Sequence, residues 1–194
     1  MRLLKGWVLG VALSLGIVGA YAGPYEDGLD AAGRGDFSSA AKLVRKAADD
    51  GNAKAQLFLG LMYETGTGVP KDDQQAVAWS RKAAEQGHAA AQRSLGVMYA
   101  NGRGVPKDDQ QAVAWSRKAA EQGNAAAQSN LGLMYAIGTG VPKDDQQAYF
   151  WWLLSSAQGY EQARKNRDIL ESRLTPNQRA AAQAQARDWK PRKQ

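Results

Sequence analysis

The chain repeats itself with a fixed period of 36 residues. The stretch Gly68–Ala76 (GVPKDDQQA) recurs unchanged at 104–112 and again at 140–148. A period of this size is typical of solenoids, in which each supersecondary unit packs only against its neighbours. We therefore predict one elongated surface that holds another macromolecule. The full units are 51–86, 87–122 and 123–158.

Each unit is predicted to contain two helices joined by a glycine loop. In the first unit, Ala55, Leu59, Met62 and Tyr63 are spaced to share one face of a first helix, called helix A below. A Gly-x-Gly pair at 66–68 then ends that helix, because glycine adopts backbone conformations that other residues resist. No strand is predicted, so the fold class is all-α, an α/α superhelical solenoid.

The second helix of the unit, helix B, is predicted to begin after Asp72. Asp72 is the expected N-cap, and Gln75 stands three residues on, where it would complete a capping box. Gly60 lies inside helix A although glycine costs about 1 kcal/mol there relative to alanine, so we expect helix B to approach too closely for a Cβ. The inner face of helix B is predicted to comprise Ala76, Trp79, Ser80, Ala83 and Ala84.

The two ends of the array differ from the units between them. Residues 23–50 resemble a shortened unit, with Asp36 at the place of Asp72, and residues 159–194 form a degenerate unit that we interpret as a C-terminal cap. The apolar segment 149–154 would form a socket for this cap, filled by Leu170, Leu174 and Trp189. The alternative is an exposed aromatic patch that binds carbohydrate or peptide.

Residues 1–22 have the pattern of a secretory signal peptide. A short basic start precedes an uncharged apolar run, and Ala20-Tyr21-Ala22 is a small-x-small cleavage site. We expect cleavage after Ala22, a periplasmic or secreted protein, and no stable membrane insertion afterwards; the alternative is an uncleaved anchor. The last unit is rich in lysine and arginine, but in an exported protein these cations do not indicate nucleic acid. They leave open an attraction to envelope polymer.

Residues that suggest chemistry have simpler structural interpretations, and we expect no catalytic residue, cofactor or metal. The sequence has no cysteine, which excludes a disulfide framework and thiolate-bound metal. The acidic pairs at 72–73, 108–109 and 144–145 stand at helix starts, where capping explains them. His88 is the single histidine and occupies a polar helix-start position. Ser39 and Lys42 match a Ser-x-x-Lys element that lacks its companion motifs.

The units resemble the Sel-one-like repeat family. The resemblance is carried by Ala53–Tyr63, Gly66–Asp72 and Ala76–Gly87, and it recurs in the next two units. It implies a superhelix related to tetratricopeptide repeats and a role in protein–protein interaction, usually without enzymatic activity. Exported bacterial relatives are linked to envelope functions. Cysteine-rich relatives are associated with β-lactams, but they staple each unit with a cysteine pair that this chain lacks.

Comparison of the units with one another predicts where a protein or peptide partner binds. Helix B and the loop are nearly constant, whereas helix A differs between units, and in this architecture helix A is expected to line the concave side. Contact with cell-wall peptidoglycan through the aromatics and the basic last unit is the alternative. The predicted partner-binding residues are Lys54, Leu57, Phe58, Glu64, Arg93, Ser94, Asn101, Ser129, Asn130 and Ile137.

Overall fold

The computed structural model describes residues 23–192, so the predicted signal peptide lies outside the described residues. Between these limits the chain forms ten α-helices and no strand, which confirms the all-α class. The helices are α1 (Pro24–Gly33), α2 (Phe37–Asp49), α3 (Ala53–Thr65), α4 (Asp73–Glu85), α5 (Ala89–Asn101), α6 (Asp109–Glu121), α7 (Ala125–Ile137), α8 (Asp145–Ala157), α9 (Glu161–Glu171) and α10 (Pro176–Asp188).

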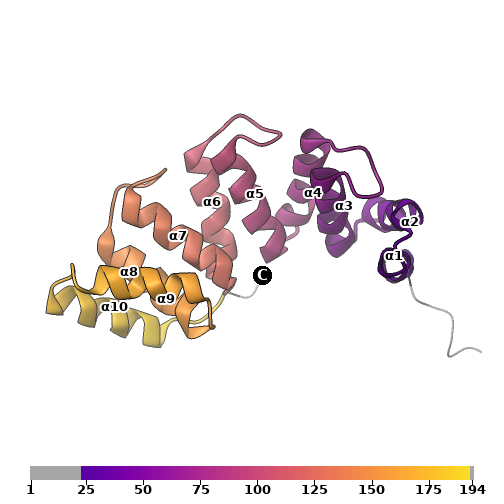
Figure 1. Ribbon diagram of the computed structural model, residues 1–194. Helices are drawn as coiled ribbons and strands as arrows, with labels where there is room; N and C mark the ends of the chain where they lie inside the picture. The colour runs from indigo at the N-terminus through magenta and orange to yellow at the C-terminus, as the bar shows by residue number, and fades with distance from the viewer. Residues whose placement is uncertain (1–22, 193–194) are drawn as a thin grey trace, which may run out of the picture.

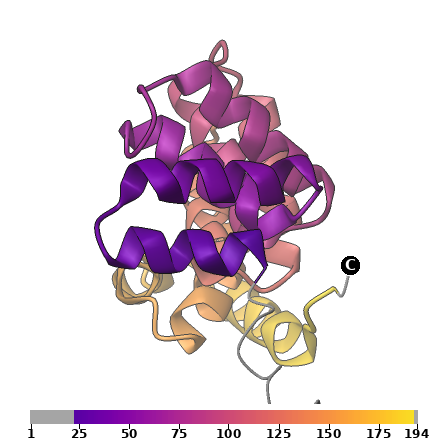
Figure 2. The same cartoon turned by 90° about the vertical axis from the view of Figure 1, so that its right-hand side faces the viewer.

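The helices are stacked in the order of the sequence along a curved path (Figure 1). Each helix from α1 to α8 packs against the next along the chain, and α9 packs on α8. The last helix breaks this order, because α10 returns to pack on α8. Figure 2 looks along the array from its N-terminal end, with α1 and α2 in front as an antiparallel pair. The arrangement is the solenoid that the period predicts.

The aspartates that were predicted as caps begin helix B in every unit. The Asp72 carboxylate accepts hydrogen bonds from the backbone amides of Gln74 and Gln75 at 2.9 and 3.0 Å, and Asp36 accepts from Ser39 at 3.1 Å. The predicted capping box with Gln75 is wrong, because the Asp72 N–H donates to the Tyr63 carbonyl of helix A at 3.0 Å instead. The capping box is present at the start of α10, between Thr175 and Gln178.

Glycines in the middle of helix A mark the close approach that the sequence predicts. A Cβ at Gly60 would lie 2.8 Å from the Ser80 hydroxyl oxygen, and one at Gly96 would lie 2.7 Å from that of Ser116. Both serines are fully buried on helix B of the same unit. The helices of a unit therefore touch backbone to backbone at this level, and only a residue without a side chain fits.

A second set of glycines joins each unit to the one before it. Gly104 has a positive φ of 68°, and a Cβ there would lie 2.0 Å from the carbonyl oxygen of Asp73, at the start of the preceding helix B. Gly68 and Gly140 make the same approach to Phe37 and Asp109. The glycine loop of each unit thus covers the start of helix B in the unit before it.

Buried glutamines form a ladder through the stack. The side-chain amide of Gln92 is almost fully buried and donates to the Ala84 carbonyl at 3.1 Å, and its oxygen accepts from Gln122 at 2.7 Å. The same bonds recur one period earlier and one later, with Gln56 and Gln128 in the place of Gln92. Each glutamine therefore connects two neighbouring units and satisfies buried polar groups that would otherwise be costly.

The C-terminal cap closes the apolar end of the array. Tyr149, Phe150, Trp151 and Trp152 of α8 are all buried. They share one core cluster with the residues that the sequence predicted would fill the socket, which are Leu170, Leu174 and Trp189. The socket interpretation is confirmed, and these aromatic rings are not available as an exposed carbohydrate platform.

Candidate protein-binding surface

The structure places only part of the predicted partner-binding set at the surface. Lys54, Asn101 and Ile137 are exposed, and Ile137 is the most open of these, at 62%. Arg93, Ser94 and Asn130 are half-buried. These six side chains remain candidates for contact with a partner.

The other four predicted residues make contacts within the fold, and only Ser129 among them is buried. Ser129 is buried at 5% exposure, and its carbonyl accepts a 3.0 Å bond from the Trp152 indole, so the expectation that its side chain meets a partner is withdrawn. Glu64 forms an ion pair with Arg103 of the next unit. Leu57 and Phe58 pack against core clusters. Differences between units at these positions adjust the packing instead of forming an open face.

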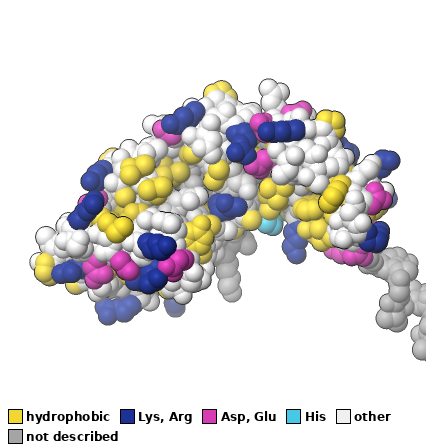
Figure 3. All heavy atoms as spheres, viewed as in Figure 1, with side chains coloured by type: hydrophobic (Ala, Val, Ile, Leu, Met, Phe, Trp, Pro, Cys, Tyr) yellow, Lys and Arg dark blue, Asp and Glu magenta, His cyan; other side chains and the backbone are white. Residues whose placement is uncertain are grey.

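An apolar side chain recurs once per unit on helix A at positions that the predicted set did not include. Leu61, Leu133 and Ile169 are 39%, 47% and 60% exposed, and Val97 is half-buried at the equivalent place. The four positions are spaced by one period, on α3, α5, α7 and α9. We call them the apolar row. Figure 3 shows hydrophobic side chains gathered over α7, in the view of Figure 1.

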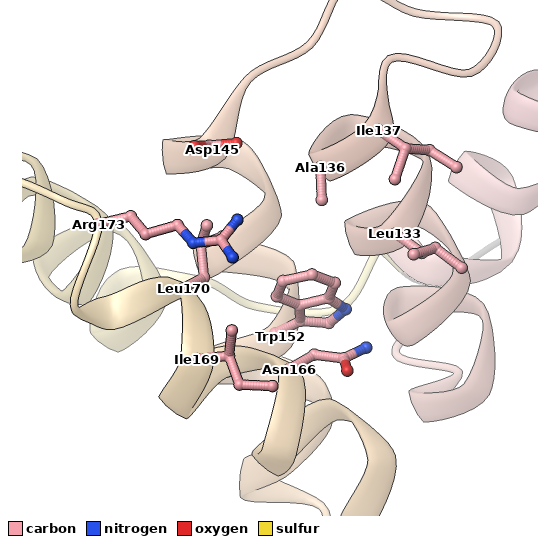
Figure 4. Close-up of a pocket in the computed structure, with 9 residues that line it drawn as sticks. All are labelled: Leu133, Ala136, Ile137, Asp145, Trp152, Asn166, Ile169, Leu170 and Arg173. Atoms are coloured by element: carbon pink, nitrogen blue, oxygen red, sulfur yellow. The ribbon is translucent and has the colours of Figure 1, made fainter.

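The row ends in a pocket of about 200 Å³ between α7, α8 and α9, here called the α7–α9 pocket (Figure 4). Leu133 and Ile137 come from α7, Ile169 from α9, and the Trp152 ring from α8 lies between them. Ile137 is the one predicted site residue that lies in this pocket. The complete lining is Leu133, Ala136, Ile137, Asp145, Trp152, Asn166, Ile169, Leu170 and Arg173.

Two departures from the repeat accompany the pocket. Trp152 stands where the other units have Ser80 and Ser116, so a large ring takes the place of the small group between helices A and B. Pro176 stands where the other units have the loop glycine, so no glycine loop covers the start of α8. The ring and the missing loop together leave an indentation next to the last two residues of α7.

The two charged side chains that line the pocket differ in whether they have an ion-pair partner. The Asp145 carboxylate lies 3.6 Å from the Lys143 ammonium, which compensates it. Arg173 is exposed, and among the described residues its guanidinium has neither an ion-pair nor a hydrogen-bond partner. Helix α7 itself carries no charged residue. The pocket is therefore an apolar depression with one uncompensated cation at its edge.

The residues that suggested chemistry are placed as structural elements. Asp72, Asp108 and Asp144 are N-caps, and within residues 23–192 no group of three potential ligands is arranged to hold a metal ion. His88 is the N-cap residue of α5 and is half-buried, with no side-chain capping bond. Ser39 lies in the first turn of α2, where its backbone amide bonds to Asp36.

Within residues 23–192, ten helices stacked around a periodic core make this a helical repeat protein. The Sel1 repeat matches residues 20–52, 53–88, 89–124 and 125–160. The chain belongs to the Sel1 repeat family. Repeats of this family generally mediate protein–protein interaction and are typically non-catalytic scaffolds. No helix in the described part of the chain has the length and apolar character needed to span a bilayer.

Two solved structures resemble this fold. A Sel1 repeat protein from Oxalobacter formigenes is 37% identical with a TM-score of 0.69, over 74% of this chain and 62% of that one. A protective antigen present in uropathogenic Escherichia coli strains, with an SLR fold, is 32% identical with a TM-score of 0.60, over 86% of this chain and 44% of that one. This chain thus spans less than two thirds of either length. A comparison with curated proteins gives no match.

Proposed function

We propose that this protein is a scaffold that binds a protein partner on its helix A face, along the apolar row and into the α7–α9 pocket. The observation that carries the proposal is the apolar row itself, which has one aliphatic side chain per unit at one repeated position, exposed at Leu61, Leu133 and Ile169 and half-buried at Val97. Exposed apolar groups that line up on one face, next to an apolar depression, are typical of partner-binding surfaces.

The proposal places the partner across several units instead of at one. Buried Leu59, Leu95 and Leu131 hold helix A of each unit in the same setting, so the exposed positions two residues further on face the same way in every unit. A partner that lies across the units would cover successive members of the row. Whether this face is the concave one stays a prediction.

Site-specific photocrosslinking in cells tests the proposal. A photoreactive residue at position 133 is expected to capture a defined protein. The same photoreactive residue in place of Ala114, which is exposed on α6, the helix B of its unit, serves as the matched control. Capture with equal yield at both positions, or at neither, would contradict the helix A face.

A double variant separates binding from folding. The double variant Leu133→Glu with Ile169→Glu is expected to abolish the crosslink made from position 97, because two apolar groups of the row are replaced by charges. Both side chains are exposed, so the fold should tolerate the change. Substitutions at exposed sites usually change stability by only about 0.5 kcal/mol or less, so the thermal midpoint should stay near that of the parent. An unchanged crosslink in this variant would remove the row from the interface.

We further propose that the protein acts outside the cytoplasm, in the periplasm or the medium, which rests on the pattern of residues 1–22. Mass spectrometry of protein isolated from the native host is expected to give a chain that begins at Gly23. A mature chain that retains Met1 or the apolar run would contradict export by cleavage.

A further inference from the structure

We propose that the α7–α9 pocket recognises a partner segment in which an aliphatic side chain stands next to an acidic side chain. This inference rests on the proposed function, since it names the chemistry recognised at one point of that surface. It is carried by the size of the pocket, by its apolar walls and by the uncompensated charge at its edge.

The size and walls of the pocket select an aliphatic side chain. Its volume of about 200 Å³ exceeds that of an engineered apolar cavity of about 150 Å³ that binds benzene. Leu133, Ile137 and Ile169 expose aliphatic surface on either side of the Trp152 ring (Figure 4). A leucine or isoleucine side chain placed there would remove apolar surface of its own and of three exposed residues from water.

The charges at the pocket select an acidic neighbour. In Figure 4 the Arg173 side chain extends over the pocket toward the Trp152 ring, and no described residue pairs with it. The acid in the lining, Asp145, already has Lys143 as its partner. A carboxylate on the partner would therefore meet one unpaired guanidinium, whereas a partner cation would be repelled by that guanidinium and would compete with Lys143 for the Asp145 carboxylate.

The same preference extends along helix A. Lys54 and Arg93 have no ion-pair partner among the described residues, and the acid Glu64 is held by Arg103. An acidic side chain fits this pattern better than a terminal carboxylate, which proteins usually hold in a nest of several backbone donors. Besides the Asp145 carboxylate next to Lys143, the polar side-chain groups at the pocket are the Arg173 guanidinium and the Asn166 amide.

The three isoleucines of the chain make a direct test possible. Two of them, Ile137 and Ile169, line the pocket, and the third, Ile17, lies in the predicted signal peptide. The mature chain 23–194, labelled at isoleucine δ1-methyl groups, gives two NMR signals, and both residues line the pocket. The probe is N-acetyl-glutamyl-leucinamide, and the matched neutral probe is N-acetyl-glutaminyl-leucinamide.

The glutamyl probe is expected to shift the Ile137 and Ile169 signals. It should bind about threefold more tightly than the glutaminyl probe, as for a solvent-accessible ion pair. The difference should shrink at about 0.5 M NaCl, where screening acts over a few ångströms. Replacing the leucine of the probe by alanine should remove the shifts.

Two variants test whether Arg173 causes the preference for the glutamyl probe. Arg173→Gln should make the two probes equal, and Arg164→Gln should not, because Arg164 lies on α9, the helix that precedes Arg173, and is paired with Glu161. Equal affinity of the two probes for the parent, or no shift of either isoleucine signal at about 20 mM probe, would overturn the inference. A crosslink at position 133 together with equal probe affinities would leave the proposed function standing and remove only the acidic preference.

Discussion

The backbone amide of Arg192 donates a 2.8 Å hydrogen bond to the carbonyl oxygen of Glu121, and its guanidinium pairs with the carboxylate of the same residue at 2.9 Å. The two residues are 71 positions apart, so the segment after α10 returns to the end of α6. Pro191 and Trp189 lie against Gly123 in the turn that follows. This segment fastens the C-terminal cap to the second unit.

The fastening is expected to depend on the Trp189 ring more than on the ion pair. The Arg192 side chain is 75% exposed, so Arg192→Ala should cost less than about 1 kcal/mol. Trp189 packs against the C-terminal core cluster, and Trp189→Ala should cost about 1–3 kcal/mol, since the ring is only partly buried. Urea unfolding measures both, with Lys190→Ala as the exposed control. A larger loss for Arg192→Ala than for Trp189→Ala would contradict this ranking.

Two glycines of one loop provide a matched pair for the contact between units. Gly102 and Gly104 have nearly equal φ values of 66° and 68°, but a Cβ would meet the Lys107 Cβ at 3.3 Å in the first case and the Asp73 carbonyl oxygen at 2.0 Å in the second. Gly102→Ala should cost about 1–2 kcal/mol for the left-handed conformation alone. Gly104→Ala should cost a further 1–3 kcal/mol, roughly, for overpacking. Equal free energies of unfolding for the two variants would argue against the close approach.

The close contact within a unit predicts a coupled pair. Gly96→Ala should destabilise the protein, because its Cβ would lie 2.7 Å from the Ser116 hydroxyl oxygen. Ser116→Gly in the same chain should recover part of the loss, with a coupling energy of about 1 kcal/mol for residues in contact. A double-mutant cycle by chemical denaturation gives this quantity. Strict additivity of the two single changes would mean that the helices separate to admit the methyl group.

The N-cap of α2 predicts a small dependence of stability on pH. Hydrogen bonds from the Ser39 side chain and then from its backbone amide lower the pKa of the Asp36 carboxyl group from its ordinary 3.8. A lowered pKa contributes stability that is present above 3.8 and is lost as the pH falls through the lower value of the folded state. Asp36→Asn keeps a capping oxygen, so it should change little at neutral pH and lose less stability on acidification. Parallel pH profiles for parent and variant would exclude this role.

Most of the fold could be predicted from the sequence because the chain repeats every 36 residues. Gly60, Asp72 and the buried face of helix A were predicted correctly, because their surroundings recur from unit to unit, apart from Trp152 in the place of the small serine in the third unit. The capping box at Gln75 was wrong for a non-local reason, since the Asp72 N–H is taken by Tyr63 across the loop. The capping-box rule considers only four consecutive residues, so it does not take the Tyr63 carbonyl oxygen into account.

The candidate site was predicted less well, because variation between units has two causes. Ser129 and Glu64 differ from their counterparts in order to pack or to pair, and a comparison of sequences does not separate this from exposure to a partner. Ile169 was missed because the last unit was treated as a cap only, although it stands one period after Leu133. The other three members of the apolar row, Leu61, Val97 and Leu133, were also outside the predicted set.

The loop glycines carry a consequence for how such proteins change in length. Each of them sits on the preceding helix B, and the glutamine ladder passes through the same junction, so a unit such as 87–122 has identical partners before and after it. An in-frame duplication or loss of that segment would meet ready-made junctions on both sides. Adding or removing one 36-residue unit would therefore lengthen or shorten the solenoid and add or remove one member of the apolar row. The α7–α9 pocket would stay unchanged at the C-terminal end.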